Sequence, residues 1–511
     1  MSTAPKAICK RYFTEVADNS GSGTSGTWKC KCGKTLVQKR NTGWSNLLNH
    51  IKKQHPEKPS GDSQTFMHSF MGETSTSRKG RNIYGWIRLV CEGLRPFDFV
   101  EDPIIREYVK LENISTETLR KYMNLLTKEV ETKITNLLPN KIALVFDGWS
   151  KASTHFVGIF ATFPDQQQTL GYDRVLLSFA PMFSETEFGA DEHFEYIEWV
   201  LSIYNKSLGN VVALIGDNVS VNKALATKCN IPLIGCASHR FNLAVKDYQK
   251  PWNDLLDKLN NLMVKLKNPK LSGKLRRHTN LRPVSRNETR WSSTFSMVER
   301  YCQIRETLAQ AEFSSDKSLL EFLPTPKEST EISDLLKHFT KFNSVQKSLQ
   351  KEDVGLADAR ILFDHITMEY PLMKKYLASD AGIVHSPTFE KAVIKIQNEK
   401  TTQLSDDETD AIVILKLEQS ESAATVADGE DDFASTILKK RRSELKGDTS
   451  SGYLNIKFLL PTSNLVERFF STAKMTFNDH RQSLLPVNLE EQLFLKINAR
   501  LYDEELVSSL C

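Results

Sequence analysis

The sequence predicts an α/β protein in which a mixed β-sheet is covered by helices, with a small metal-bound module at the N-terminus. Three apolar segments with short connections, residues 142–146, 156–163 and 174–181, predict adjacent strands. Helix and strand then alternate as far as residue 235, which makes the expected sheet mixed. A group of Cys and His residues between positions 30 and 55 predicts the N-terminal module.

The composition is that of an ordinary globular protein and indicates no function by itself. Of the 511 residues, 40% are hydrophobic and 25% are charged. No apolar run approaches the ~18 residues of a membrane helix, and residues 1–10 lack the apolar region of a secretory signal. We therefore expect no membrane partner and a place in the cytosol or nucleus. The eight cysteines indicate reduced thiols, some of them metal ligands, and argue against a disulfide framework.

The net charge of +4 conceals two basic regions and one acidic region. Residues 1–60 carry eleven basic and three acidic side chains, and residues 251–300 carry eleven and four. Residues 401–435 carry one and ten. Basic regions attract polyanions and release counterions on binding DNA, so they favour a nucleic-acid partner; solvated surface faces are the alternative.

Composition and the spacing of apolar residues divide the chain into seven segments, which span residues 1–56, 57–82, 83–139, 140–244, 245–400, 401–450 and 451–511. The second segment is rich in Ser, Thr and Gly and predicts a linker, whereas the third has apolar residues at helical spacing. The fourth holds the predicted strands, a helix over 191–207 and a helix beginning near Val219. The fifth is mostly helical, the acidic sixth is expected to be disordered, and the last returns to a helical pattern.

Four residues of the first segment have the spacing of zinc ligands. Cys30 and Cys32 lie in the string KCKCG, and His50 and His55 lie a little over one turn apart in a predicted helix. Zinc prefers sulfur and nitrogen ligands in a tetrahedron, and a β-knuckle opposite a helix supplies them in a ββα-type finger. The spacing between the two cysteines is tighter than usual, so Cys9 remains an alternative zinc ligand. The alternative to a zinc site is a chance cluster of Cys and His residues.

Two acids come directly after predicted strands. Asp147 follows residues 142–146 in the string FDGWS, and Asp217 follows residues 211–216 in the string GDNVS. If these strands are parallel neighbours, both carboxylates lie at one edge of the sheet and can hold a divalent cation. A pair of Mg²⁺ ions can activate water and stabilise the leaving 3′ oxygen of a DNA strand. Helix capping is the alternative role of each Asp.

The string TSNLVERFFSTAKMTFNDHRQSLLPVNLEEQLFLKINARLY at residues 462–502 resembles the dimerisation region of the hAT family of cut-and-paste DNA transposases. The hallmark of that region is an acidic residue and an Arg before Phe-Ser, here Glu467 and Arg468. The N-terminal module resembles a BED zinc finger. Further matches follow in the order of the family: PFDFVEDP at 96–103, Asp147, Asp217, Cys236-Ala-Ser-His239 with Asn242-Leu243, and Thr289-Arg290-Trp291.

The resemblance implies an RNase H-like core that is interrupted, over roughly residues 245–460, by a helical insertion. It implies that Asp147, Asp217 and Glu467 hold Mg²⁺ or Mn²⁺ and that His239 lies against the scissile phosphate. It further implies that Trp291, beside Arg290, stacks on an unstacked base. In the finger it implies that four cations contact DNA phosphates or base edges: Lys39, Arg40, Lys52 and Lys53.

Each of these roles has a structural alternative. Cys236 and His239 can be a strand-end thiol and a helix-capping imidazole. Trp291 can be a core aromatic, and Glu467 with Arg468 can form a surface ion pair. The finger cations can be a solvated helix face. The basic run at 439–442 predicts nuclear localisation, with a solvated helix end as the alternative.

Two hypotheses for function follow. The first is a hAT-type transposase in the nucleus that binds double-stranded DNA through its zinc finger, forms a homodimer or higher homo-oligomer through residues 462–502, and cuts and joins DNA strands with the acidic triad. The second is a domesticated, catalytically inactive DNA-binding regulator. Retention of the triad favours the first. An RNase H-like nuclease acting on RNA is disfavoured by the DNA-type finger and the dimerisation region.

Overall fold

The computed structural model describes residues 13–16, 25–39, 47, 50, 76–151, 154–183, 189–287, 290–417, 452–477 and 485–511. These residues form two compact units, one made of the chain up to Tyr84 together with Glu504–Cys511 and the other made of Gly85–Asp503. Each unit has a buried apolar core of its own.

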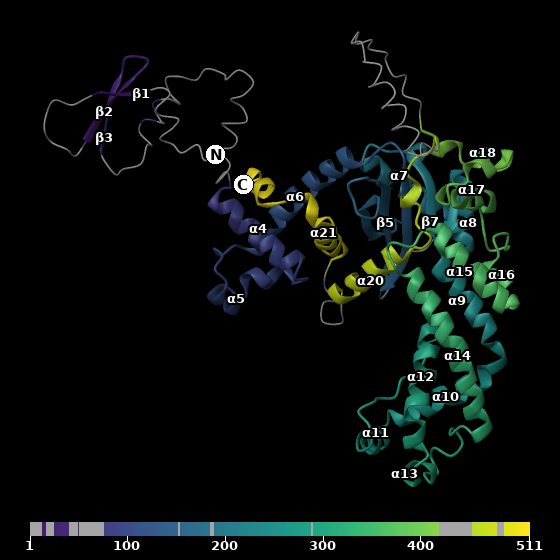
Figure 1. The fold of residues 1–511 in the computed structure, drawn as a ribbon. Coiled ribbons are helices and arrows are strands. Elements are labelled where there is room, and N and C mark those ends of the chain that lie inside the picture. The colour runs from purple at the N-terminus through teal and green to yellow at the C-terminus, as the bar shows by residue number, and fades with distance from the viewer. Residues whose placement is uncertain are drawn as a thin grey trace. The chain divides into compact units, whose positions relative to one another are not determined.

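The N-terminal unit contains a three-stranded antiparallel sheet (Figure 1). Strand β1 (Phe13–Val16) pairs with β2 (Ser25–Cys30), and β2 pairs with β3 (Thr35–Lys39). Its core consists of Phe13, Trp28, Cys30 and Leu47, the last of which is helical. The sequence predicted a ββα module; β1 is an additional strand, which the burial of the Phe13 ring in this core stabilises.

Helix α4 (Arg78–Cys91) begins earlier than the sequence suggested. We expected a linker as far as residue 82, but Ile83, Trp86, Ile87 and Val90 recur at helical spacing and are all buried. The first turn of the helix precedes these residues, and Asn82 of the same helix is also buried. In the N-terminal unit, Arg81 of α4 forms an ion pair of 2.8 Å with Glu504, at the start of α22 (Glu504–Ser509).

The second unit continues with three helical segments, η1 (Phe97–Glu101), α5 (Pro103–Tyr108) and α6 (Thr116–Leu137). The Asp102 side chain caps α5 by accepting a hydrogen bond of 2.8 Å from the amide of Ile104. Helix α6 buries a stripe of apolar side chains and packs against α21 (Pro486–Ile497). These helices match the helical pattern that the sequence shows before residue 139.

The centre of the second unit is a five-stranded mixed sheet with the order β6–β5–β4–β7–β8. Strands β4 (Ile142–Lys151), β5 (Thr154–Pro164) and β6 (Tyr172–Pro181) are antiparallel, whereas β7 (Val211–Gly216) and β8 (Leu233–Gly235) run parallel to β4. Consecutive residues of β4 and β7 are buried, as in a sheet that is covered on both faces. The predicted mixed α/β architecture is confirmed.

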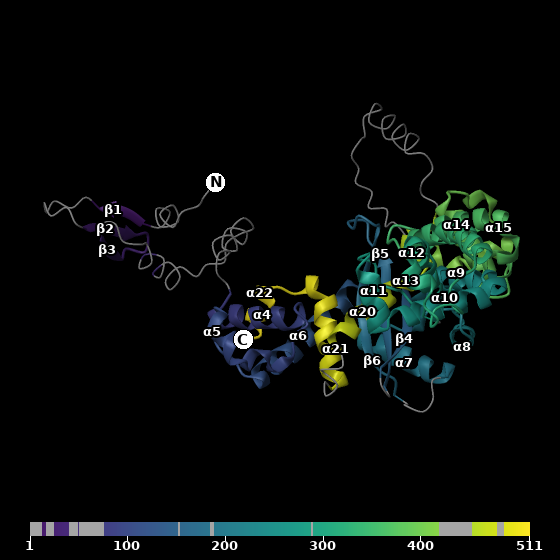
Figure 2. The same ribbon diagram turned by 90° about the horizontal axis from the view of Figure 1, so that it is seen from below.

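Five helices and two short 3₁₀ segments lie next to these strands in sequence or in space: α7 (Ala190–Ile203), η2 (Leu208–Asn210), α8 (Ser220–Cys229), α9 (Ala237–Tyr248), α20 (Asn464–Thr476), α21 and η8 (Ala499–Leu501). Helix α20 contacts β4 and β5, and α21 contacts β6, as Figure 2 shows from below. The C-terminal helices therefore cover the antiparallel half of the sheet.

The segment between α9 and α20 is largely helical. Its elements are η3 (Lys250–Trp252), α10 (Asn253–Leu266), α11 (Pro269–Arg276), α12 (Trp291–Leu308), α13 (Ala311–Ser314), α14 (Pro326–Leu349), α15 (Leu356–Glu369), η4 (Pro371–Met373), α16 (Lys374–Leu377) and α17 (Pro387–Gln397). An aromatic core joins α9, α12, α14 and α15.

Residues 401–417 are folded, although we expected them to belong to a disordered acidic spacer. They form η5 (Thr401–Gln403), α18 (Asp406–Ala411) and η6 (Val413–Leu415). A capping box of Ser405 and Glu408 starts α18, and the Glu408 carboxylate also binds Lys395 at 2.6 Å. Buried Ile412 and Leu415 then anchor the segment, and the described chain resumes at Gly452, shortly before η7 (Ile456–Phe458). The remainder of the expected spacer lies outside the described residues.

Within the described part of the chain, no helix combines the length and the apolar character that a bilayer-spanning segment needs.

Candidate functional site

Asp147 and Asp217 lie on neighbouring parallel strands. Val145 of β4 is the partner of Ile215 of β7, so each acid follows a paired position by two residues. The Asn222 amide, in the first turns of α8, donates a hydrogen bond of 2.6 Å to Asp217 Oδ1. The parallel pairing on which the sequence argument depended is therefore present.

The expectation that both acids end a strand is wrong for Asp147. Strand β4 continues to Lys151, because its second half pairs with β5, where Asp147 lies opposite Gly158. Strand β7 does end before its acid. Asp147 is thus held in a continuous ladder, which fixes the backbone of the site on one side.

The chain that leads into α20 is tied to the loop after β8. The Ala237 amide donates to the Pro461 carbonyl at 2.8 Å, and the Ser463 amide donates to Cys236 Sγ at 3.4 Å. The Asn464 amide donates to Ser238 Oγ at 3.1 Å. These bonds join the start of α20 to the start of α9.

Gly158 of β5 allows α20 to approach the sheet closely. A Cβ atom at this position would lie 3.1 Å from side-chain atoms of both Val466 and Phe470. The Phe470 ring also stacks on Trp149 of β4, with ring centroids 6.2 Å apart. Glu467, between these contacts, lines the same pocket as the two Asp residues.

This pocket, which we call the acidic pocket, has a volume of about 600 Å³. Its lining combines residues from the sheet, from α20 and from the helical segment between α9 and α14: Asp147, Gly148, Trp149, Asp217, Ser238, His239, Asn242, Asn287, Arg290, Trp291, Ser292, Gln346, Gln350, Asn464, Glu467, Phe470, Ser471 and Lys474. It brings together six predicted site residues that are far apart in the sequence.

Electrostatics in the pocket favour a bound cation. Burial raises the pKa of Asp147 to about 7, and the charges of Asp217 and Glu467 act in the same direction. The Gly148 amide, which donates to Asp147 Oδ1 at 2.9 Å, and the Arg290 charge oppose this rise. Positive charge stabilises the ionised form of a buried carboxyl group such as Asp147, and a set of carboxylate oxygens is the donor set that Mg²⁺ and Mn²⁺ prefer. The residues therefore fit a divalent cation.

Glu467 forms an ion pair across the acidic pocket. The Arg290 guanidinium donates to Glu467 Oε2 at 2.6 Å. Arg290 is placed by the start of α12, where the Trp291 amide donates to Asn242 Oδ1 at 3.1 Å. In the described residues the oxygens of the three acids do not all lie within 4.8 Å of one another. One of these acids, Glu467, is held in the ion pair with Arg290.

The structural alternative for Glu467 and Arg468 was a surface ion pair between the two side chains. Arg468 does not form this ion pair. Its guanidinium donates to Glu352 Oε1 at 3.0 Å and to the Gln350 carbonyl at 3.1 Å. The two residues project from α20 into different pockets, because consecutive residues of a helix point about 100° apart.

Trp291 is a core aromatic, so its expected role in stacking on a base is not available in this conformation. Its side chain is 2% exposed and lies against the rings of Phe241, Phe295, Phe339 and Phe342. The indole Nε1 donates to Gln346 Oε1 at 3.4 Å. A Trp at the first position of an amphipathic helix packs into the core when its neighbouring helices present aromatic partners, as α9 and α14 do here.

Cys236 is a buried structural residue, whereas His239 lines the acidic pocket. Cys236 is fully buried between β8 and α9, and burial raises the pKa of its thiol to about 11. This matches the strand-end thiol that was its structural alternative. His239, one turn later on α9, lines the acidic pocket.

Cys30, Cys32 and His50 form a second candidate site, in the N-terminal unit. Their ligand atoms all lie within 4.8 Å of one another, and Cys32 Sγ is 3.2 Å from His50 Nε2. Gly33, with a φ of +89°, closes a tight turn in which its amide donates to the Cys30 carbonyl at 2.8 Å. The turn explains how thiols separated by one residue reach the same imidazole, and the donor set fits zinc.

Several predicted residues cannot be placed. Arg40, Lys52, Lys53 and His55 lie outside the described residues, as do Cys9 and the basic run at 439–442. Lys39 ends β3, and its side chain is outside the described set.

Three polar residues of the acidic pocket were not predicted from the sequence: Lys474, Gln346 and Gln350. Lys474 lies on the same face of α20 as Glu467, seven residues later, and a count of the helical period would have found it. Gln346 and Gln350, four residues apart on and after α14, enter through tertiary packing that the sequence does not reveal.

No protein-family model matches the sequence, and no curated protein matches it. Among solved structures, the chain is similar to one described as "Drosophila P element transposase strand transfer complex", with a TM-score of 0.30 and 12% identical residues. The match covers 91% of this chain and 100% of that chain. A likeness with a TM-score this low does not assign a function to the chain.

Proposed function

We propose that the protein is a hAT-type DNA transposase, or a protein derived from one, that cuts DNA strands at the acidic pocket. The observation that carries this proposal is the meeting of Asp147, Asp217 and Glu467, from three distant parts of the chain, in one pocket with His239 and Arg290. The strand order, with one acid on the first strand and one after the fourth, supports an RNase H-like core.

Asp147, Asp217 and Glu467 would hold a divalent cation, Mg²⁺ or Mn²⁺. When bound, the cation supplies charge neutralisation at the scissile phosphate and lowers the pKa of an attacking water. Asp147 and Asp217 provide ligands from a rigid sheet edge, and Glu467 provides the third when its ion pair with Arg290 opens.

Two cationic or polar groups are available to the phosphate of the DNA. His239 lines the pocket from the first turn of α9, where the positive end of the helix dipole also favours an anion. Arg290, released from Glu467, offers a planar guanidinium that suits phosphate oxygens. Binding of the strand and binding of the cation are therefore coupled through the same ion pair.

The remaining parts of the proposal extend the same function. The zinc finger, with Cys30, Cys32, His50 and His55 as ligands, binds double-stranded DNA through Lys39, Arg40, Lys52 and Lys53 and raises the effective concentration of the core at its substrate. Residues 462–502 mediate homodimerisation, and the protein acts in the nucleus.

The proposal is tested by strand cleavage. Supercoiled plasmid is incubated with the full-length protein and Mn²⁺, and the nicked form is measured for the wild type, Asp217→Ala and the control Asp380→Ala, which removes an exposed acid outside the pocket. We expect the wild type and the control to nick the plasmid and Asp217→Ala to lose at least ~99% of the rate. Equal nicking by all three proteins would eliminate the triad.

A binding-only regulator is the second candidate, and the ion pair of Arg290 with Glu467 favours it if that pair persists on DNA. The same experiment separates the two. A wild-type protein that shifts DNA in a gel but leaves the plasmid intact with both Mg²⁺ and Mn²⁺ is the regulator.

A further inference from the structure

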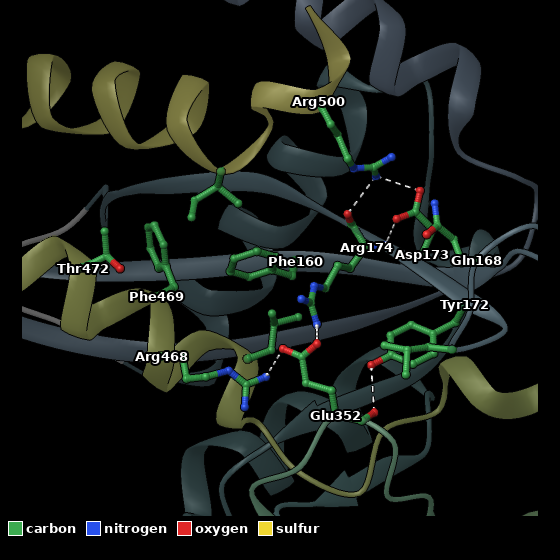
Figure 3. A pocket seen from close by; sticks show the side chains of 13 residues that line it. Phe160, Gln168, Tyr172, Asp173, Arg174, Glu352, Arg468, Phe469, Thr472 and Arg500 are labelled. Carbon is green, nitrogen blue, oxygen red and sulfur yellow. Dashed lines mark hydrogen bonds and ion pairs between the residues drawn. The ribbon is translucent and has the colours of Figure 1, made fainter. Parts of the chain in front are cut away.

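A second pocket lies on the other flank of α20, and three arginines line it (Figure 3). Its volume is about 450 Å³, and Arg174 of β6, Arg468 of α20 and Arg500 of η8 enter it from distant parts of the chain. We call it the arginine pocket. Arg468 belongs to the acidic-Arg pair that the sequence singled out, and the proposed cleavage chemistry does not use it.

The three guanidiniums share only two carboxylates among the residues that line the pocket. Arg174 binds Glu352 Oε2 at 3.0 Å and Arg468 binds Glu352 Oε1 at 3.0 Å, whereas Arg500 binds Asp173 at 2.7 Å. The lining therefore carries an excess of one positive charge. Each arginine uses a single contact to its carboxylate, although a guanidinium can donate two parallel hydrogen bonds to one anion.

The two carboxylates differ in how firmly they are held. The Asp173 side chain is 8% exposed, and it orients Arg500, which also donates to the Arg174 carbonyl at 3.1 Å. The Glu352 side chain is 38% exposed and lies in the connection between α14 and α15. Asp173 is thus a fixed part of the pocket, whereas Glu352 is an exposed anion between two arginines.

The floor of the pocket is apolar. Phe160 of β5 and Phe469 of α20 meet edge to face, with ring centroids 5.6 Å apart, and Leu465 and Ile497 lie beside them. An arginine rim above an apolar floor suits a ligand that joins an anionic group to a less polar body. The volume lies within the range of pockets that hold such molecules, about 300–1,000 Å³.

We propose that the arginine pocket binds a phosphate group of a nucleotide unit, and that Glu352 occupies the place of that phosphate in the ligand-free protein. A phosphate oxyanion can accept paired hydrogen bonds from Arg174 and Arg468 together, which a single carboxylate shared between them cannot do. The base or sugar then lies toward the apolar part of the pocket lining. Either a free nucleotide or one nucleotide of a DNA strand supplies this chemistry.

The test measures binding of deoxyadenosine monophosphate to the full-length protein by isothermal titration at constant ionic strength, with deoxyadenosine as the phosphate-free comparison. We expect the nucleotide to bind and deoxyadenosine to bind at least about tenfold more weakly, since charged hydrogen bonds to the phosphate are lost. Arg174→Ala and Arg468→Ala each weaken nucleotide binding by about tenfold or more. The control Arg305→Ala, which removes an exposed arginine on α12, leaves it unchanged.

Glu352→Gln provides a variant that gains binding, so the result does not depend on a damaged protein. Removing the charge that competes with the phosphate strengthens nucleotide binding by about three- to tenfold. A labelled single-stranded oligothymidylate distinguishes the two sources: its affinity falls in Arg174→Ala and Arg468→Ala if the pocket holds a DNA strand, and stays constant if the pocket holds a free nucleotide. Two results would overturn the proposal. One is the absence of nucleotide binding at about 10 mM, a concentration at which even a very weak affinity is detected. The other is equal nucleotide binding by the wild type and both arginine variants. These outcomes do not depend on whether the acidic pocket cuts DNA.

Discussion

Replacing Asp147 by Asn should stabilise the metal-free protein. Burial and the nearby charge of Asp217 raise the pKa of Asp147 from its usual 3.8 to about 7, so the folded state disfavours the ionised carboxylate. Each pH unit corresponds to ~1.4 kcal/mol, and the ionised form therefore costs the folded state up to ~4 kcal/mol at pH 8. Asn carries no charge, and its carbonyl can still accept the hydrogen bond from the Gly148 amide.

The sign of the pH dependence follows from the raised pKa. Below about pH 3.8 the carboxyl group is neutral in both the folded and the unfolded state, so wild type and variant should be equally stable. Between pH 3.8 and 7 the unfolded state loses its proton first, and the wild type is progressively destabilised relative to Asn. The advantage of the variant should be complete at pH 8.

The assay is thermal unfolding in EDTA at pH 4 and pH 8. Because relaxation and solvent access reduce the penalty, we expect Asp147→Asn to raise the free energy of unfolding by ~2–4 kcal/mol at pH 8, or the midpoint by about 2–5 °C, and to have little effect at pH 4. Asp380→Asn, an exposed acid outside the pocket, serves as the control and should change neither. A variant that is no more stable than wild type at pH 8 would refute the electrostatic reasoning.

Three further predictions concern other parts of the molecule. Arg290→Ala should tighten Mn²⁺ binding by about fivefold, because Glu467 is freed from an ion pair worth ~1 kcal/mol; weaker binding would contradict the competition. Glu490→Gln should raise the free energy of unfolding by ~1–3 kcal/mol at pH 8 but not at pH 4, since burial raises the pKa of Glu490 from 4.5 to about 7, whereas exposed Glu321→Gln should do nothing in the same melts. Cys32→Ser should lower the zinc content measured by atomic emission and weaken DNA binding; full zinc occupancy in the variant would exclude this thiol as a ligand.

The positions of the two Asp residues could be predicted from the sequence because each follows a short apolar run, which favours a buried strand. The pairing of β4 with β7 was a condition of that argument, and it depends on the crossover through α7, which local residues do not specify. The continuation of β4 beyond Asp147 was missed, because Gly148, Ser150 and Lys151 break the apolar run and are held in the strand by β5.

Side-chain partners across long sequence separations were not predictable. The ion pair of Arg290 with Glu467 is one example. The distance between these two residues depends on the packing of α12 against α9 and on the close approach of α20 to Gly158. Likewise, nothing in the local sequence of Trp291 distinguishes a buried indole from one that is exposed for stacking. That distinction depends on the aromatic rings that α9 and α14 bring to it.

The most direct test of the central claim is the binding of Mn²⁺ to the acidic pocket, measured by electron paramagnetic resonance of the free ion during titration of zinc-loaded protein. The claim predicts that wild type and Asp380→Asn bind Mn²⁺ and that Asp217→Asn and Glu467→Gln each lose at least about tenfold in affinity, because each variant removes one ligand. Unchanged Mn²⁺ affinity in both pocket variants would show that these carboxylates do not hold a cation and would contradict the account.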